Sequence, residues 1–345
     1  IITTSKTTLR QFLRYAKPAS KPVQEYLTFG QLLLRSLYQT NEIVQIMKKD
    51  YSSNKSKWRD QAETLSEALP NLRRFNGETI VIKFGGHAMG DPKLADLFAR
   101  DIVLLRQVGI NPIVVHGGGP QIAAMLERLN IKSTFVSGLR VTDNNSIKII
   151  EMVLAGSINK KIVSAINLAG ACAVGICGKD GDLIKAERMS LSKKNTYDKS
   201  SDLGLVGAPS KINPNILKAF EKANIIPIIA PIAMGKDGET LNINADTVAG
   251  AIASAVRATR LYMLTDVPGV LDKNEELIPD ISIADAKKYI KNGIIDGGMI
   301  PKITTCVESI MAGVECAAII DGRVQHSILI ELFTAGGAGT LIRAK

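Results

Sequence analysis

Cysteine and histidine are both scarce in this sequence. Its 345 residues include four cysteines and three histidines, too few for the cysteine-dense framework of a small disulfide-stabilised protein. The spacings Cys172-x4-Cys177 and Cys306-x9-Cys316 match no zinc-binding pattern, and the carboxylates show no spacing typical of a metal cage. The sequence therefore predicts reduced, packed thiols, a reducing compartment and no metal held by protein ligands.

Long hydrophobic runs and the standard nucleotide-binding signatures are also missing. No stretch of about 18 uncharged apolar residues occurs, so no transmembrane helix and no membrane partner are expected. Neither GxxxxGK[ST] nor GxGxxG at a strand-to-helix turn is present, which argues against a P-loop and against a Rossmann dinucleotide site. A phosphate group would have to be bound by another loop architecture.

The net charge of +10 is concentrated at the start of the chain. Residues 1–58 carry +7 and the remainder carries +3, so the body has no basic field and nucleic-acid binding is not expected. Residues 1–24 hold five Lys/Arg and no acid, which is typical of an organellar transit segment or of a disordered tail. We expect a cytoplasmic protein, or an organellar-matrix protein if this extension is a transit segment.

The order of short apolar strands and helical patterns predicts the fold class. Strands are expected over 79–83, 111–115, 173–177, 225–229 and 261–264, and helices over 94–108, 121–129, 146–168 and 246–258. This alternation predicts an α/β sandwich of three layers around a mainly parallel sheet. Residues 59–75 form a further amphipathic pattern, in which Pro70 should bend or end the helix. Its apolar stripe could pack on the adjacent domain or on another subunit.

Three glycine-rich turns follow expected strands or precede expected helices. They are Lys83-Phe84-Gly85-Gly86, His116-Gly117-Gly118-Gly119-Pro120 and Asp296-Gly297-Gly298-Met299-Ile300-Pro301-Lys302. Glycines at such turns let backbone N–H groups approach an anion, and a helix N-terminus adds a favourable dipole. Two of the turns adjoin a lysine, which strengthens the prediction of an anion site.

Polar residues near strand ends allow more than one interpretation. Arg140 suits bidentate capture of a carboxylate, although a surface salt bridge would also explain it. Asn244 or Asp246 could simply cap a helix. His116 could act as a base, but a histidine between a buried strand and glycines is more often structural.

The motifs taken together resemble a known family. Lys83-Phe-Gly-Gly, His116-Gly-Gly-Gly-Pro, Gly138-Leu-Arg-Val-Thr, Asn242-Ile-Asn-Ala-Asp, Thr265-Asp-Val-Pro-Gly and Gly297-Gly-Met-Ile-Pro-Lys302 occur in this order. The set resembles the amino acid kinase family over residues 59–343, and within it the members that phosphorylate N-acetyl-L-glutamate. The resemblance implies two lobes, an acetylglutamate-binding lobe over 76–240 and an ATP-binding lobe over 241–345.

This resemblance implies a role for each matching residue. The cofactor would be ATP with Mg²⁺, and the side-chain carboxylate of N-acetyl-L-glutamate would accept the γ-phosphoryl group on the route to arginine. The implied catalytic residues are Lys83, Lys302 and Asp246; the implied phosphate-binding residues are Gly85, Gly86 and Gly118; the implied substrate-binding residues are Gly117, Gly118, Arg140 and Asn242; and the implied nucleotide-binding residues are Thr265 and Asp266. An ionised carboxylate needs no general base, which agrees with the lack of a poised histidine–carboxylate pair.

Two further segments resemble the arginine-inhibited branch of these kinases. Residues 59–75 match the helix through which dimers assemble into a hexamer, and the stretch from His326 through Glu331 to Gly337 matches an L-arginine pocket. Arg260 also falls in that pocket, where a lysine would be expected. The alternatives are a kinase for glutamate, aspartate or a nucleotide, and a non-catalytic arginine-sensing domain of the same family.

Overall fold

The computed structural model describes residues 58–86, 89–189 and 202–345. Residues 1–57 lie outside this range, so the expectations for the basic extension are not addressed by the structure. Residues 58–75 are helical, and the helix continues past Pro70 to Phe75. Of the two alternatives expected at Pro70, the structure excludes that the helix ends there, because a proline removes one backbone donor without preventing the following turn from forming. Within the described residues, no helix has the length and apolar character needed to cross a membrane.

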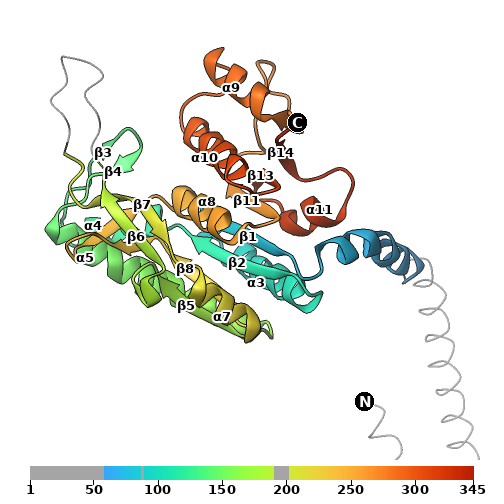
Figure 1. Cartoon of the computed structure of the whole chain (residues 1–345), viewed down its shortest axis with the longest axis horizontal. Coiled ribbons are helices and arrows are strands. Elements are labelled where there is room, and N and C mark those ends of the chain that lie inside the picture. Colours follow the sequence, from blue (N-terminus) through green and yellow to red (C-terminus); the bar gives the residue numbers. More distant parts are fainter. Residues whose placement is uncertain (1–57, 87–88, 190–201) are drawn as a thin grey trace, which may run out of the picture. The chain divides into compact units, whose positions relative to one another are not determined.

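An eight-stranded sheet forms the centre of residues 68–345 (Figure 1). In sheet order its strands are β12 (Asp280–Ser282), β14 (Gly339–Arg343), β13 (Cys316–Asp321), β11 (Arg260–Thr265), β1 (Thr79–Phe84), β2 (Asn111–His116), β8 (Ile226–Ala230) and β5 (Ala173–Cys177). The strands from β13 to β5 are parallel, and β14 runs antiparallel to β13. The mainly parallel sheet predicted from the sequence is confirmed.

Both faces of the sheet are covered by helices, because both faces of its strands are apolar. Ile80, Ile82 and Phe84 of β1 belong to one buried cluster, to which α3 (Pro92–Gln107), α4 (Gly119–Arg128), α6 (Asn159–Leu168) and α11 (Ser327–Phe333) contribute. Val81 belongs to the cluster on the opposite face, together with α7 (Asn215–Lys222), α8 (Ala245–Val256), α9 (Ile283–Lys291) and α10 (Met299–Met311). The expected three layers follow from this alternation.

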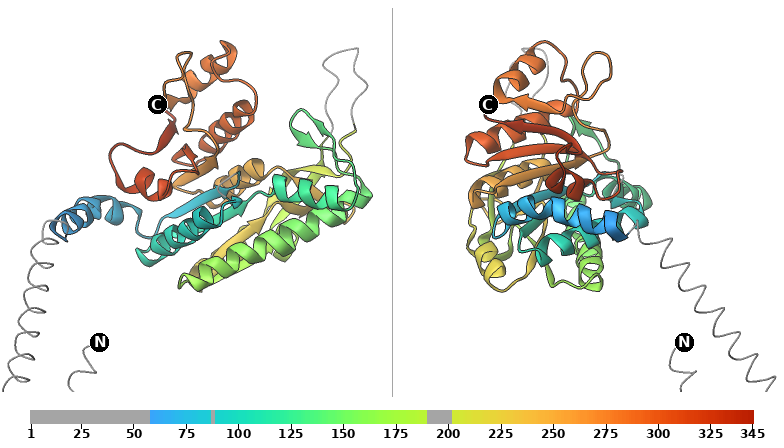
Figure 2. Two further views of the ribbon diagram at one scale, coloured as in Figure 1. Left: turned by 180° about the vertical axis from the view of Figure 1, so that it is seen from behind. Right: turned by 90° about the vertical axis from the view of Figure 1, so that its right-hand side faces the viewer.

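The long helical pattern predicted over 146–168 is interrupted. It consists of α5 (Asn144–Glu151), a π-helix over Met152–Ile158 and then α6, which Figure 2 shows as one long green helical run. Asp143 caps its start, with a capping box that involves Ser146. π-Helical turns are rare and are frequently found at functional sites.

Shorter strands lie beyond the central sheet. Four of them, β6 (Ile184–Arg188), β7 (Val206–Ile212), β9 (Ile232–Met234) and β10 (Thr240–Ile243), pair in a closed ring. A hairpin joins β3 (Phe135–Val136) to β4 (Leu139–Arg140). A short 3-10 turn spans Asp180–Asp182. The ring and the hairpin bring Asn242 and Arg140 to the edge where the parallel strands end.

Candidate active site

The first two glycine turns lie side by side because β1 and β2 are paired in register. Phe84 stands opposite His116, and the Gly117 N–H donates a hydrogen bond of 2.8 Å to the Phe84 carbonyl. A side chain at Gly85 would place its Cβ 2.7 Å from Lys83 Nζ. Glycine at this position therefore leaves room for the lysine to extend over the turn.

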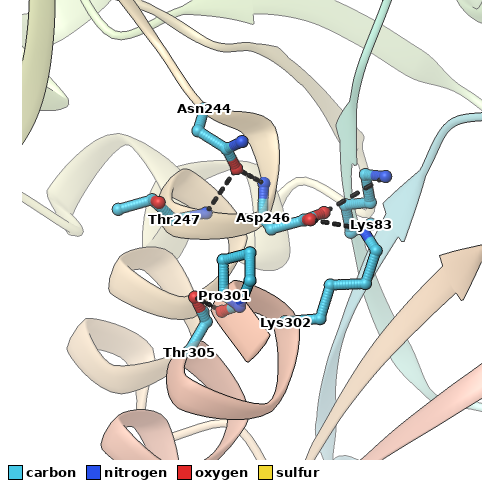
Figure 3. A network of polar contacts seen from close by, with 7 residues as sticks. All are labelled: Lys83, Asn244, Asp246, Thr247, Pro301, Lys302 and Thr305. Carbon is cyan, nitrogen blue, oxygen red and sulfur yellow. Dashed lines mark hydrogen bonds and ion pairs between the residues drawn. The ribbon is translucent and has the colours of Figure 1, made fainter. Parts of the chain in front are cut away.

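Three charged side chains from different elements meet at one point (Figure 3). Lys83 at the end of β1 forms an ion pair of 3.1 Å with Asp246 Oδ1. Lys302 in the first turn of α10 donates a hydrogen bond of 2.6 Å to Asp246 Oδ2. The carboxylate thus bridges two ammonium groups that come from residues far apart in the chain.

Asp246 is held in place by the N-terminus of α8. Asn244 is the N-cap, and its side-chain oxygen accepts hydrogen bonds from the backbone N–H groups of Asp246 and Thr247 at 2.8 and 3.3 Å. The Asp246 side chain is 8% exposed, against 11% for Lys83 and 20% for Lys302. Burial alone would raise the pKa of Asp246, but the two ammonium groups outweigh this effect and hold the pKa below its usual range. The carboxylate is therefore ionised at neutral pH.

These side chains line a cavity of about 280 Å³. Its lining contains all three implied catalytic residues and all the implied phosphate- and substrate-binding residues. They are Lys83, Gly85, Gly86, Gly117, Gly118, Arg140, Asn242, Asp246 and Lys302. The structure therefore brings together nine positions that the sequence motifs place in five separate segments.

Arg140 enters this cavity from the β3–β4 hairpin. Its guanidinium donates a hydrogen bond of 3.1 Å to the Gly119 carbonyl and another to Ser133 Oγ, and it lies 4.6 Å from the centre of the Phe135 ring. Burial lowers the pKa of Arg140, but a guanidinium remains charged at neutral pH. Asn242 faces the same space and donates a hydrogen bond of 3.4 Å to Thr142 Oγ1.

The two implied nucleotide-binding residues do not line this cavity. Thr265 is the last residue of β11, and Asp266 follows it. A Cβ at Gly86, which has a φ of +68°, would overlap the Asp266 carboxylate. Gly86 therefore separates the two: it lines the cavity itself, and Asp266 lies against it from outside the cavity.

His116 is fully buried and does not face the cavity as a free base. One ring nitrogen lies 2.8 Å from the Gly117 carbonyl and the other 3.2 Å from the Asn159 amide nitrogen. Burial lowers the pKa of His116 to about 4, so its ring is neutral near pH 7. These observations favour the structural interpretation over the catalytic one.

The residues of the implied arginine pocket do not line this cavity, and they lie at two separate positions near the two ends of α11. Glu331 accepts a hydrogen bond of 2.6 Å from the Ala338 N–H, and a Cβ at Gly337 would lie 2.9 Å from Glu331 Oε2. Burial raises the pKa of Glu331, while Arg260 and the Ala338 N–H act in the opposite direction. His326 lies at the other end of α11, where its Nδ1 is 2.6 Å from an oxygen of the buried Asp101.

Arg260 is engaged by groups other than Glu331. It forms an ion pair of 3.2 Å with Glu315, and its guanidinium lies 5.0 Å from the centre of the Phe75 ring. Arg74 binds the same Glu315 oxygen at 2.6 Å and lies 5.2 Å from the same ring. Arginine at position 260 is thus fixed at the end of the helix that spans residues 58–75.

Sequence reasoning missed the apolar part of the cavity wall. The missed residues are Ile122, Phe135, Leu139, Leu154, Val206 and Pro231. Only Leu139 falls within a motif, where Arg140 carried the argument; the other five lie outside the motifs and look like ordinary core or loop residues. They form a wall suited to methyl and methylene groups opposite the charged residues.

The donor set in the cavity does not provide a resident divalent-cation site. Among the described residues that line the cavity, Asp246 is the only carboxylate, and each of its oxygens faces an ammonium group. Within the described ranges, no group of three or more His, Cys, Asp or Glu side chains is placed to hold a metal ion. A cation at this site would therefore be held chiefly by oxygens of a bound ligand.

The chain is similar to known proteins over most of its length. A profile of the amino acid kinase family matches residues 78–321. An acetylglutamate kinase of Rhodospirillum centenum is 59% identical over 295 residues, covering 85% of this chain and 97% of that relative.

Solved structures of N-acetylglutamate synthase from Neisseria gonorrhoeae share the fold. The complex with coenzyme A and N-acetyl-glutamate has a TM-score of 0.73 at 24% identity and covers 82% of this chain and 63% of the synthase. The complex with coenzyme A and L-arginine has a TM-score of 0.70 at 23% identity and covers 82% and 65%. The chain thus spans less than two thirds of the synthase, and this likeness concerns the fold. The family profile and the 59% identity to the kinase relative show that the chain belongs to the amino acid kinase family.

Proposed function

We propose that this protein transfers the γ-phosphoryl group of ATP to the side-chain carboxylate of N-acetyl-L-glutamate, forming N-acetyl-L-glutamyl 5-phosphate and ADP. The observation that carries the proposal is the convergence of Lys83 and Lys302 on Asp246 at a cavity that also holds Arg140 and Asn242. The 59% identity to an acetylglutamate kinase supports this choice of acceptor within the family.

The reaction joins two anions, so it requires alignment and fixed positive charge. A carboxylate oxygen of the acceptor attacks the γ-phosphorus, and the bond from that phosphorus to the β–γ bridging oxygen breaks. Lys83 and Lys302 offset the negative charge of the transferring group from two sides, and Asp246 keeps both ammonium groups in place. No proton has to be removed from the acceptor, which is ionised at neutral pH.

The remaining lining residues hold the substrates. Gly117, Gly118, Arg140 and Asn242 hold N-acetyl-L-glutamate, with Arg140 on its α-carboxylate. The backbone N–H groups of Gly85, Gly86 and Gly118 bind phosphoryl oxygens. Mg²⁺ would be held chiefly by oxygens of ATP rather than by residues of this chain, and it would offset negative charge on the phosphates. Thr265 and Asp266 line the nucleotide site on the far side of the glycine turn.

Acyl phosphate formation tests the proposal directly. The purified chain is incubated with Mg·ATP and hydroxylamine, which converts an acyl phosphate into a coloured hydroxamate. We expect hydroxamate with N-acetyl-L-glutamate and little with free glutamate or aspartate. Equal or greater product with a free amino acid would assign the enzyme to another acceptor, and no product with any acceptor would point to a sensing domain.

We also propose feedback inhibition by L-arginine in a hexamer. The half-buried Glu331 offers a carboxylate for the effector's guanidinium, and Arg260 lies close enough to weaken that site by like charge. Leu65 and Leu69 in the 58–75 helix are 71% and 44% exposed, which supports their burial against another subunit. All four cysteines are free thiols, three of them buried and Cys172 exposed, which supports a reducing compartment such as the cytoplasm or an organellar matrix.

Titration with L-arginine in the hydroxamate assay tests this regulation. We expect inhibition of the wild-type enzyme, loss of inhibition in Glu331→Gln, and inhibition at lower concentration in Arg260→Lys. Light scattering of the same samples reports the oligomeric state. Activity that stays unchanged in millimolar arginine, in a confirmed hexamer, would contradict the proposal.

A further inference from the structure

Gly118 carries a buried backbone N–H at the wall of the cavity. Gly118 is buried, lines the cavity and precedes α4 as its N-cap. Within the described part of the chain, its N–H donates to no protein acceptor. A buried amide without an acceptor is costly, so this donor is suited to a ligand in the cavity.

The neighbouring His116 ring is held by two hydrogen bonds that fix its tautomer. A carbonyl can only accept, so the nitrogen 2.8 Å from the Gly117 oxygen, Nδ1, carries the proton. Nε2 then accepts from the Asn159 side-chain amide at 3.2 Å. Because burial keeps this ring neutral, Nδ1 donates one hydrogen bond while Nε2 accepts the other.

The bond from His116 to the Gly117 carbonyl also sets the direction of the Gly118 N–H. The described residues contain no cis peptide bond, and in a trans peptide the C=O and the following N–H point in opposite directions. The Gly117 carbonyl is directed at the buried ring. The Gly118 N–H is therefore directed away from that ring, on the side where Gly118 borders the cavity.

Asn159 ties this arrangement to the π-helix and the sheet. It is fully buried at the end of the π-helix, donates 2.9 Å to the Ile228 carbonyl of β8 and accepts 3.2 Å from Lys160 Nζ. Two π-helix residues, Leu154 and Ile158, pack so closely on Gly118 that a Cβ there would lie within about 2.6 Å of each. The π-helix therefore contacts Gly118, and Asn159, which follows it as the first residue of α6, contacts the His116 ring.

We propose that His116, anchored by Asn159, is a positioning residue that aims the Gly118 amide at an oxygen of the transferring phosphoryl group. The proposal rests on the phosphoryl-transfer function proposed above and assigns a use to a histidine that the reaction itself does not need. His116 touches neither substrate and acts through the peptide between Gly117 and Gly118.

Two substitutions of His116 separate positioning from packing. Asparagine places an amide nitrogen near the position of Nδ1 and retains a donor for Gly117, whereas glutamine places its polar atoms near Nε2 and removes that donor. We expect kcat within about threefold of wild type for His116→Asn and at least tenfold lower for His116→Gln, because loss of one fixed donor to an oxyanion costs about 10²–10³. The KM for N-acetyl-L-glutamate should stay within about threefold in both, since Arg140 and Asn242 are unchanged.

A packing role predicts the reverse order, because glutamine fills more of the space left by the ring than asparagine does. Equal kcat values, or a higher kcat for His116→Gln, would overturn the proposal. The Tm of each variant is measured alongside, and kcat is compared at a temperature where both are folded.

A second measurement does not depend on activity. In protein labelled with ¹⁵N-histidine, long-range proton–nitrogen spectra distinguish the two neutral tautomers, and the signal of His116 is the one that disappears in His116→Asn. We expect Nδ1 protonated and Nε2 unprotonated at pH 7. The opposite tautomer, or a charged ring, would overturn the proposal whatever the kinetics. If the Nδ1–H tautomer is found but wild-type protein forms no acyl phosphate, the proposed function fails while the peptide orientation stands.

Discussion

Replacement of Lys83 by methionine removes one of the two ammonium groups with little change in side-chain shape. In the proposed reaction that charge stabilises the transferring phosphoryl group inside a largely buried site. Fixed charges and donors of this kind contribute about 3–4 kcal/mol to the transition state. We therefore expect the turnover of Lys83→Met to fall about 10²–10³-fold.

The same substitution should cost less in stability than in activity. Asp246 keeps Lys302 at 2.6 Å, so its carboxylate is not left alone in the interior. The free energy of unfolding should accordingly fall by less than the roughly 3–5 kcal/mol that an uncompensated buried charge costs. Urea denaturation measures this loss, and the hydroxamate assay measures turnover.

Lys179 provides a matched control outside the cavity. It forms an ion pair of 2.7 Å with Glu151 and donates 2.6 Å to Thr240 Oγ1, so Lys179→Met also removes a paired lysine. Its turnover should remain close to that of wild type. A Lys83→Met enzyme that is folded and within about threefold of wild-type turnover would refute the assignment of Lys83 to the reaction.

Three further predictions follow from the same geometry. Asp246→Asn should lose most activity, because two ammonium groups then face each other without a counter-charge. The pKa of Asp246 in the folded protein lies below its ordinary value of 3.8. The carboxylate therefore stabilises the fold above that pH, and this contribution is lost as the pH falls through the folded-state pKa. Acid denaturation of Asp246→Asn should lack this component. Asp143→Ala should lower stability by about 1 kcal/mol through loss of the helix cap, measured by urea denaturation, with a Tm equal to wild type counting against it. Gly85→Ala should reduce kcat with little change in Tm, because its Cβ displaces Lys83 Nζ; unchanged kinetics would show that the ammonium position is not critical.

The sequence was informative where one periodic pattern coincided with one element. The strand predicted over 173–177 agrees with β5, and that over 79–83 ends one residue before β1 does. Strands buried on both faces have this signature because their side chains pack against helices on either side. Two of the glycine turns could likewise be located, since they follow β1 and β2, which are parallel neighbours and end at the same edge of the sheet.

Other features depend on contacts that no local pattern encodes. The pairing of β10 with β7 joins segments that are distant in sequence, and neither has a long apolar run. The π-helix over Met152–Ile158 has the same apolar spacing as the α-helices that flank it, so periodicity predicted one continuous helix. Asn159 lies within that pattern and carries no local signal of its role, and in the structure it is fully buried against His116.

The last two side chains of β1, Lys83 and Phe84, point to opposite faces of the sheet and therefore have different surroundings. Lys83 points toward α8 and Asp246, whereas Phe84 points to the other face, where its ring stacks on Phe98 at 3.8 Å between centroids. Inserting or deleting a single residue in this strand would exchange the two faces. An ammonium group would then enter an aromatic core while a phenyl ring faced Asp246, so the register of this one six-residue strand affects both the packing of the core and the charge of the cavity.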